Sequence, residues 1–117
     1  RRAGRPQIAY VGEPELDMVD GVPAMIARFE ASSPSGVPIR VSALPKVVIA
    51  DGFESDPPHG AQQPQVLKWL DSQGAVAAAD SASCVVPVAG GTWAVVVSVP
   101  PDAMISVALK AEVETER

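Results

Sequence analysis

The stretch that decides the fold class is Gly90-Gly91-Thr92-Trp93-Ala94-Val95-Val96-Val97-Ser98-Val99-Pro100-Pro101-Asp102-Ala103-Met104-Ile105-Ser106-Val107-Ala108-Leu109-Lys110-Ala111-Glu112-Val113-Glu114. From Ile105 to Glu114, apolar residues alternate with mostly polar ones, and this period of two is typical of a half-buried strand. The run from Trp93 to Val99 is apolar on both faces, as in an interior strand. Between them, Pro100-Pro101-Asp102-Ala103 favours a type I turn. These residues predict a C-terminal hairpin.

Residues 24–44 show a similar alternation, interrupted by a turn-like segment at residues 32–36. The pattern predicts a second hairpin, with Arg28 and Arg40 pointing outward on neighbouring strands. Shorter strand candidates lie at residues 7–11, 46–50 and 84–88. Residues 13–20 alternate only in part, and Pro14 would place them at a sheet edge. Pro45 indicates a bend or a switch between sheets.

Residues 64–73 carry the signals of a short helix. Pro64 suits a first helical position, and Gly74 stands just past the expected end. A strand from Gln65 to Leu70 is the alternative for the same segment.

Together these segments predict a fold that is all-β or mainly β: an antiparallel β-sandwich of about six to eight short strands, with one short helix near residues 64–73. Twelve prolines and nine glycines interrupt the chain often, which favours short strands over long helices. The length of 117 residues predicts a single domain. Residues 7–117 would form the sandwich, and residues 1–6 a disordered basic tail.

Charge and composition exclude several partners. Four of the nine cationic residues lie at the chain ends, so the body of the chain is more acidic than the net charge of −5 indicates. Such a body repels phosphate backbones, which predicts no nucleic-acid partner. No run reaches the roughly 18 apolar residues of a membrane helix, which predicts no membrane partner.

Cys84 is the single cysteine, so an intrachain disulfide is impossible and a cytoplasmic location is expected. Its apolar neighbours predict a buried core residue rather than a nucleophile. The start at Arg1 without methionine indicates a piece of a larger protein, from which a targeting segment could have been lost.

The long loop at residues 51–63 holds the only histidine. His59, with a carboxylate such as Asp56, is a candidate general base. The residues around it lack the ligand spacing of calcium or zinc sites, so neither a metal nor a cofactor is predicted. Trp69, Phe53, Asp56 and His59 are the candidate ligand-binding residues, although burial in the core is the favoured interpretation of Trp69.

The leading functional hypothesis is a non-enzymatic protein–protein interaction or assembly module, whose strand edges add to a partner sheet or to a second copy. A small-ligand or carbohydrate-binding domain is the alternative, and a hydrolase that uses His59 is third. Self-association is expected through the outward side of Ala94, Val96 and Ala108.

Overall fold

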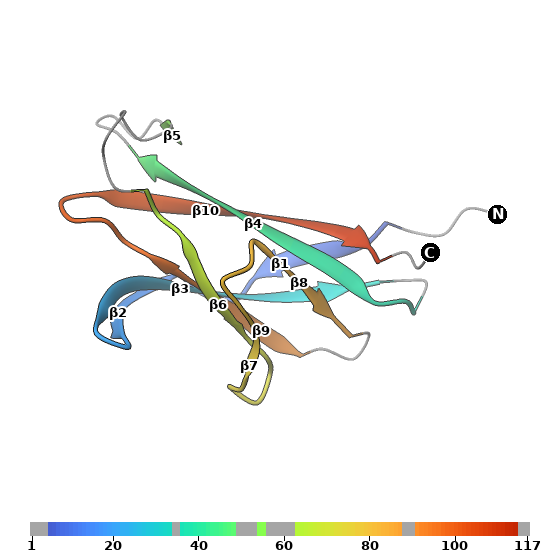
Figure 1. The fold of residues 1–117 in the computed structure, drawn as a ribbon. Coiled ribbons are helices and arrows are strands. Elements are labelled where there is room, and N and C mark those ends of the chain that lie inside the picture. Colours follow the sequence, from blue (N-terminus) through green and yellow to red (C-terminus); the bar gives the residue numbers. More distant parts are fainter. Residues whose placement is uncertain (1–4, 34–35, 49–53, 56–62, 88–90, 115–117) are drawn as a thin grey trace.

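The computed structural model describes residues 5–33, 36–48, 54–55, 63–87 and 91–114. Within these ranges the chain forms two antiparallel sheets, packed together as a β-sandwich, and no helix (Figure 1). The predicted fold class is therefore confirmed. The ten strands are β1 (Gln7–Tyr10), β2 (Glu15–Val19), β3 (Val22–Ser32), β4 (Ile39–Val48), β5 (Glu54–Ser55), β6 (Val66–Leu70), β7 (Val76–Ala79), β8 (Ser83–Val86), β9 (Thr92–Ser98) and β10 (Met104–Val113).

The first sheet has the order β1-β3-β9-β6-β7, and β2 also pairs with β3. β9 pairs with β3 along one edge. Both β1 and β2 therefore pair with the opposite edge of β3, one after the other along its length. The second sheet is built on β4. β10 pairs with β4 along its whole length on one side, while β8 and β5 share the other side. Figure 1 shows β4 and β10 as two long strands side by side.

Both hairpins predicted from the sequence are wrong. β3 pairs with β9, and β4 pairs with β10, so each expected hairpin is instead a connection that crosses between the sheets. Alternation fixes which face of a strand is buried but does not choose its neighbour. Arg28 and Arg40 consequently belong to different sheets. The turn after β9 also differs from the expected type I, because Asp102 has a φ of 56°, as the third residue of a type II turn does.

The predicted helix at residues 64–73 is wrong as well, and the strand alternative is confirmed. β6 and β7 form a hairpin whose turn is organised by Asp71. Its carboxylate accepts hydrogen bonds from the backbone N–H groups of Gln73 (2.9 Å) and Ala75 (3.0 Å). Gly74, expected to end a helix, supplies the positive φ of 85° that this turn requires.

Pro45 does not bend the chain or move it to the other sheet. It lies within β4 opposite Val107, in the gap between the segments that pair with β8 and β5. Ala43 donates its backbone N–H toward Ala82 on that side, so the ring nitrogen of Pro45 faces the gap. No ladder hydrogen bond is therefore lost to the missing N–H.

The core lies between the sheets and contains both tryptophans and Cys84, as expected from the sequence. Trp69 is fully buried and meets Phe29 edge to face, with ring centroids 5.9 Å apart. Its indole N–H donates a 2.8 Å hydrogen bond to the carbonyl of Ser81, which satisfies the polar atom of the buried ring. Cys84 is 5% exposed, and burial raises the pKa of its thiol, so it is an unreactive core residue.

Candidate interaction surface

The free edge of β10 is the longest stretch of unpaired strand in the described part of the chain. Peptide groups alternate in direction along a strand, and the N–H of Glu114 points toward β4, where it bonds to the carbonyl of Pro38 (2.9 Å). The N–H and C=O groups of Leu109, Ala111 and Val113 therefore point away from β4. No described residue pairs with them, so these groups can bond to another strand.

Tyr10 occupies the same edge nearer the start of β10. Its hydroxyl donates a 2.7 Å hydrogen bond to the carbonyl oxygen of Val107. This contact ties β1 in one sheet to β10 in the other. Farther along the same side of β10, the backbone groups of Leu109, Ala111 and Val113 have no hydrogen-bond partner among the described residues.

The side chains beneath the open edge are incompletely covered. Leu109 and Ala111 point into the sandwich but are only partly buried, whereas Val41 and Ala43, their partners on β4, are buried. The difference arises because β4 has strands on both sides and β10 has one. A further strand beside β10 would cover this apolar surface.

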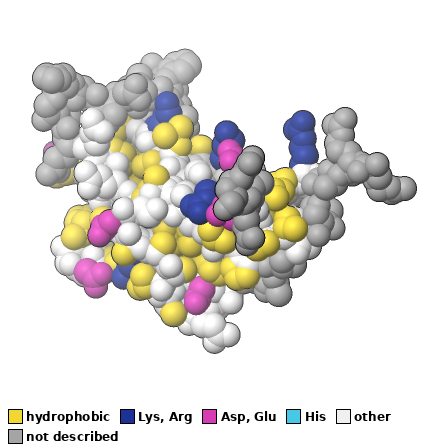
Figure 2. All heavy atoms as spheres, turned by 45° about the vertical axis from the view of Figure 1, so that its right-hand side comes forward, with side chains coloured by type: hydrophobic (Ala, Val, Ile, Leu, Met, Phe, Trp, Pro, Cys, Tyr) yellow, Lys and Arg dark blue, Asp and Glu magenta, His cyan; other side chains and the backbone are white. Residues whose placement is uncertain are grey.

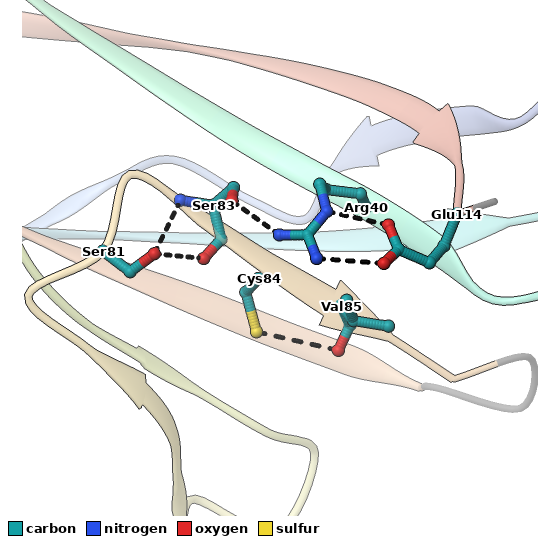
Figure 3. Close-up of polar contacts among 6 residues, drawn as sticks. All are labelled: Arg40, Ser81, Ser83, Cys84, Val85 and Glu114. Carbon is teal, nitrogen blue, oxygen red and sulfur yellow. Dashed lines mark hydrogen bonds and ion pairs between the residues drawn. The ribbon is translucent and has the colours of Figure 1, made fainter. Parts of the chain in front are cut away.

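The outer face of β10 carries a charged cluster beside the same edge. Lys110 and Glu112 form an ion pair of 3.5 Å, and both side chains are exposed. Farther along, the guanidinium of Arg40 donates to both carboxylate oxygens of Glu114 (2.8 and 3.0 Å) and to the hydroxyl of Ser83, as Figure 3 shows. The hydrogen bond from Arg40 lowers the pKa of Glu114, and the same bond raises the pKa of Arg40. The hydrogen-bonded network fixes the C-terminal end of β10 against β4.

The other sheet edges carry features that discourage pairing. β7 and β8 are four residues each, and Pro87 follows β8. The edge made by β1 and β2 is broken at residues 11–14, where Gly12 has a φ of 69° and Pro14 lacks an N–H. Short strands, prolines and breaks are the usual protections of sheet edges. β10 has ten residues and no proline, and of the usual protections it carries charged side chains, those of Lys110 and Glu112.

Apolar side chains also reach the surface near the sheet edges. Leu16 and Met18 on β2 are 73% and 60% exposed. Met25, the β3 partner of Leu16, packs against the core, whereas Pro23, the partner of Met18, is exposed. On the outer face of the second sheet, Leu44 and Met104 are exposed as well. Figure 2 shows hydrophobic side chains spread over one face of the molecule between scattered charges.

Of the four predicted ligand-binding residues, the structure describes Trp69. Trp69 is 0% exposed, so its ring is not accessible for stacking on a sugar or another planar ligand. His59, Asp56 and Phe53 lie outside the described residues, and the hydrolase hypothesis depends on them. The interpretation of Trp69 as a core residue is confirmed.

The predicted interface of Ala94, Val96 and Ala108 is not one surface. Ala94 and Val96 are 6% and 0% exposed, because β9 lies between β3 and β6. Next to Val96, the stem of Lys68 covers the sheet, and its ammonium group reaches Asp20 at 3.2 Å. Ala108 is exposed but belongs to the other sheet. Only this last residue remains available to a partner.

A cleft of about 910 Å³ opens at the end of the sandwich where β9 leads into β10. Its described walls are mostly aliphatic and proline side chains, with a few polar groups, and no aromatic ring is among these residues. The lining residues are Val22, Pro23, Gln63, Gln65, Ser98, Val99, Pro100, Pro101, Asp102, Ala103 and Met104.

Other kinds of site are not found in the described ranges. They contain no group of three or more metal-ligating side chains and no helix that could cross a membrane. The chain gives no significant match to protein-family models, curated proteins or solved structures.

Sequence reasoning missed Tyr10 and the unpaired groups of Leu109, Ala111 and Val113. The alternation of residues 105–114 marked the strand correctly, but a pattern of side chains does not show which backbone groups lack partners. No sequence signal connects Tyr10 to Val107, because the two meet only after the sheets have packed.

Proposed function

We propose that this chain is a non-enzymatic interaction or assembly module that accepts an extended strand along the free edge of β10. The observation that carries the proposal is the row of outward N–H and C=O groups at Leu109, Ala111 and Val113. Adding a strand to a sheet edge is a common mode of peptide recognition, in which backbone hydrogen bonds supply affinity. The proposal rests on this edge and not on the lack of a catalytic group.

The partly buried side chains supply a second contribution. A strand beside β10 would cover Leu109 and Ala111 with its own inward side chains. Each Å² of apolar surface removed from water is worth about 25 cal/mol, before the cost of association is subtracted. The free edge therefore combines unpaired backbone with apolar surface.

The partner segment can be described by its chemistry. Its inward residues must be apolar and spaced two apart, because they enter between the sheets beside Leu109 and Val113. Its outward residues lie beside Lys110 and Glu112, so charged residues of opposite sign to their neighbours are favoured there. Proline is excluded at positions that must donate an N–H to β10.

Ala111→Pro tests the proposal directly. The N–H of Ala111 points away from β4, so proline removes one bonding group from the free edge without removing a bond to β4. The matched control is Ala111→Val. Valine keeps the backbone N–H of residue 111, and its side chain is similar in volume to that of proline. The probe is a display library of ten-residue segments in which apolar and polar residues alternate. We expect library members to bind both the native chain and the valine variant. Their dissociation constant for the proline variant should be at least about tenfold higher.

Two outcomes would overturn the proposal. One is binding that is equally strong in the proline variant, and the other is a library that yields no binder to the native chain. Circular dichroism shows whether the proline variant folds. Should it not fold, hydrogen exchange of the native chain replaces it: the amides of Leu109, Ala111 and Val113 must become protected when a selected segment binds.

A further inference from the structure

We propose that the strand that adds to β10 is β10 of a second copy of this chain, antiparallel to the first and related to it by a twofold axis at Ala111. This inference rests on the proposed function of the free edge and identifies its occupant. A twofold interface uses the same surface on both copies, so the surface must be complementary to itself. The backbone and the charges around Ala111 meet that requirement.

The backbone pairs in register about this axis. Leu109 faces Val113 of the second copy, Val113 faces Leu109, and Ala111 faces its own equivalent. In each pair both residues present outward N–H and C=O groups, so they can exchange two hydrogen bonds. The inward side chains that meet are all apolar, which extends the core across the pairing.

The charges are also complementary about Ala111. Lys110 and Glu112 flank this residue and point outward with exposed side chains. Across the axis, Lys110 lies opposite Glu112 of the second copy, and Glu112 lies opposite its Lys110. The two ion pairs within the chains and the two between them form a ring of alternating charge. This ring favours the pairing over one in which uncharged residues face each other at these positions.

Neighbouring registers place like charges together or meet an obstacle. An axis at Lys110 sets two lysines opposite each other, and one at Glu112 does the same with two glutamates. An axis at Val113 sets Glu112 opposite Glu114. An axis at Leu109 gives Lys110 no charged partner and requires the carbonyl of Val107, which already accepts the hydroxyl of Tyr10. The axis at Ala111 avoids each of these conflicts.

Charge reversal tests the register. Two single variants, Lys110→Glu and Glu112→Lys, each place like charges across the proposed axis. Sedimentation velocity from about 1 µM to about 1 mM measures self-association, since this range spans weak dissociation constants. We expect the native chain to dimerise and each single variant to have a dissociation constant at least about tenfold higher. Both residues are exposed, so both variants should fold, which melting curves verify.

Mixing the two single variants is the decisive arm. In the mixture, position 110 of each chain faces position 112 of the other with opposite charge, so a heterodimer should form about as tightly as the native dimer. The double variant Lys110→Glu/Glu112→Lys should also recover dimerisation. A mixture that associates no better than its components would overturn the proposed register.

The remaining outcomes separate this inference from the proposed function. A native chain that stays monomeric at about 1 mM overturns the homodimer. The proposed function is still supported after that result if display segments bind the native chain and Ala111→Pro weakens their binding. A dimer that Ala111→Pro does not weaken overturns the pairing of β10 with itself, because it forms elsewhere on the molecule.

Discussion

The hydroxyl of Tyr10 donates a 2.7 Å hydrogen bond to the carbonyl oxygen of Val107, and this bond joins the edges of the two sheets. Tyr10 ends β1, and Val107 lies near the middle of β10. The bond therefore divides the free edge of β10 into a capped part and an open part. Tyr10 is 53% exposed, so its hydrogen bond to Val107 is accessible to solvent and to a competing strand.

Tyr10→Phe should lower the free energy of unfolding by about 1 kcal/mol or less, because the lost bond is partly exposed. It should also let the carbonyl of Val107 pair with an added strand, so that segments longer by one register position bind β10. Urea denaturation measures the first effect and the display assay the second. Loss of binding in this variant would show that Tyr10 supports the open edge rather than limiting it.

Trp69→Phe should destabilise the fold by about 1 to 3 kcal/mol, because it removes the donor of a partly buried hydrogen bond to the carbonyl of Ser81 and reduces contacts with Phe29. Urea denaturation measures the change. In the native chain, acrylamide should quench the fluorescence of both tryptophans poorly, since they are 0% and 6% exposed. Trp69 contributes the fluorescence component that is lost in Trp69→Phe. If acrylamide quenched this component efficiently, the burial of the Trp69 ring would be contradicted.

Gly21→Ala should destabilise the β2–β3 hairpin by about 1 kcal/mol. Gly21 has a φ of 80°, and a Cβ there would meet no atom within 4 Å, so the cost comes from the backbone conformation alone. Asp20→Asn is the control, because asparagine also tolerates the φ of 52° found at that position. Thermal melting compares the two variants. Equal melting temperatures for Gly21→Ala and the native chain would contradict the turn geometry.

The Arg40–Glu114 pair should make stability depend on pH in the acid range. The hydrogen bond from Arg40 lowers the pKa of Glu114 in the folded state, so its contribution is complete above the ordinary glutamate pKa of about 4.3. The contribution is lost as the pH falls from there through the lowered value. Glu114→Gln should therefore flatten the fall in unfolding free energy between about pH 5 and pH 3.

Arg40→Gln removes the cause of that shift and should flatten the same curve. The double variant should add little to either single change, because the two residues form one interaction. Urea denaturation at a series of pH values measures all four proteins. An unchanged slope in Glu114→Gln would show that the pair does not respond to acid.

Burial was largely predictable from the sequence, and strand pairing was not. The alternation at residues 105–113 and the two-faced apolar run from Trp93 to Val99 correctly predicted a half-buried strand and an interior strand. Which strands pair is decided by contacts between distant segments, as when Ala27 meets Val95. A single-sequence pattern contains no such information, so both hairpins were assigned to the wrong partners.

Two local features had signals in the sequence. Asp20-Gly21 is a two-residue turn in which both residues have positive φ, and the Asp-Gly pair is a strong signal for the hairpin of β2 and β3. At residues 64–74, Pro64 and Gly74 resembled the two ends of a helix. The carboxylate of Asp71 instead holds a tight turn, and packing of Trp69 on Phe29 favours the strand.

The crossing connections β3 to β4 and β9 to β10 determine when the chain can fold. The central pairs of both sheets join an early strand to one near the C-terminus, β3 to β9 and β4 to β10. During synthesis, β3 and β4 therefore cannot form their central pairings until the last quarter of the domain leaves the ribosome. Until then their apolar faces are not covered by β9 and β10. Such long-range pairing slows folding and exposes strand edges to other chains in the meantime. The interval between synthesis of β4 and of β10 is the period in which this domain is most vulnerable to misassembly.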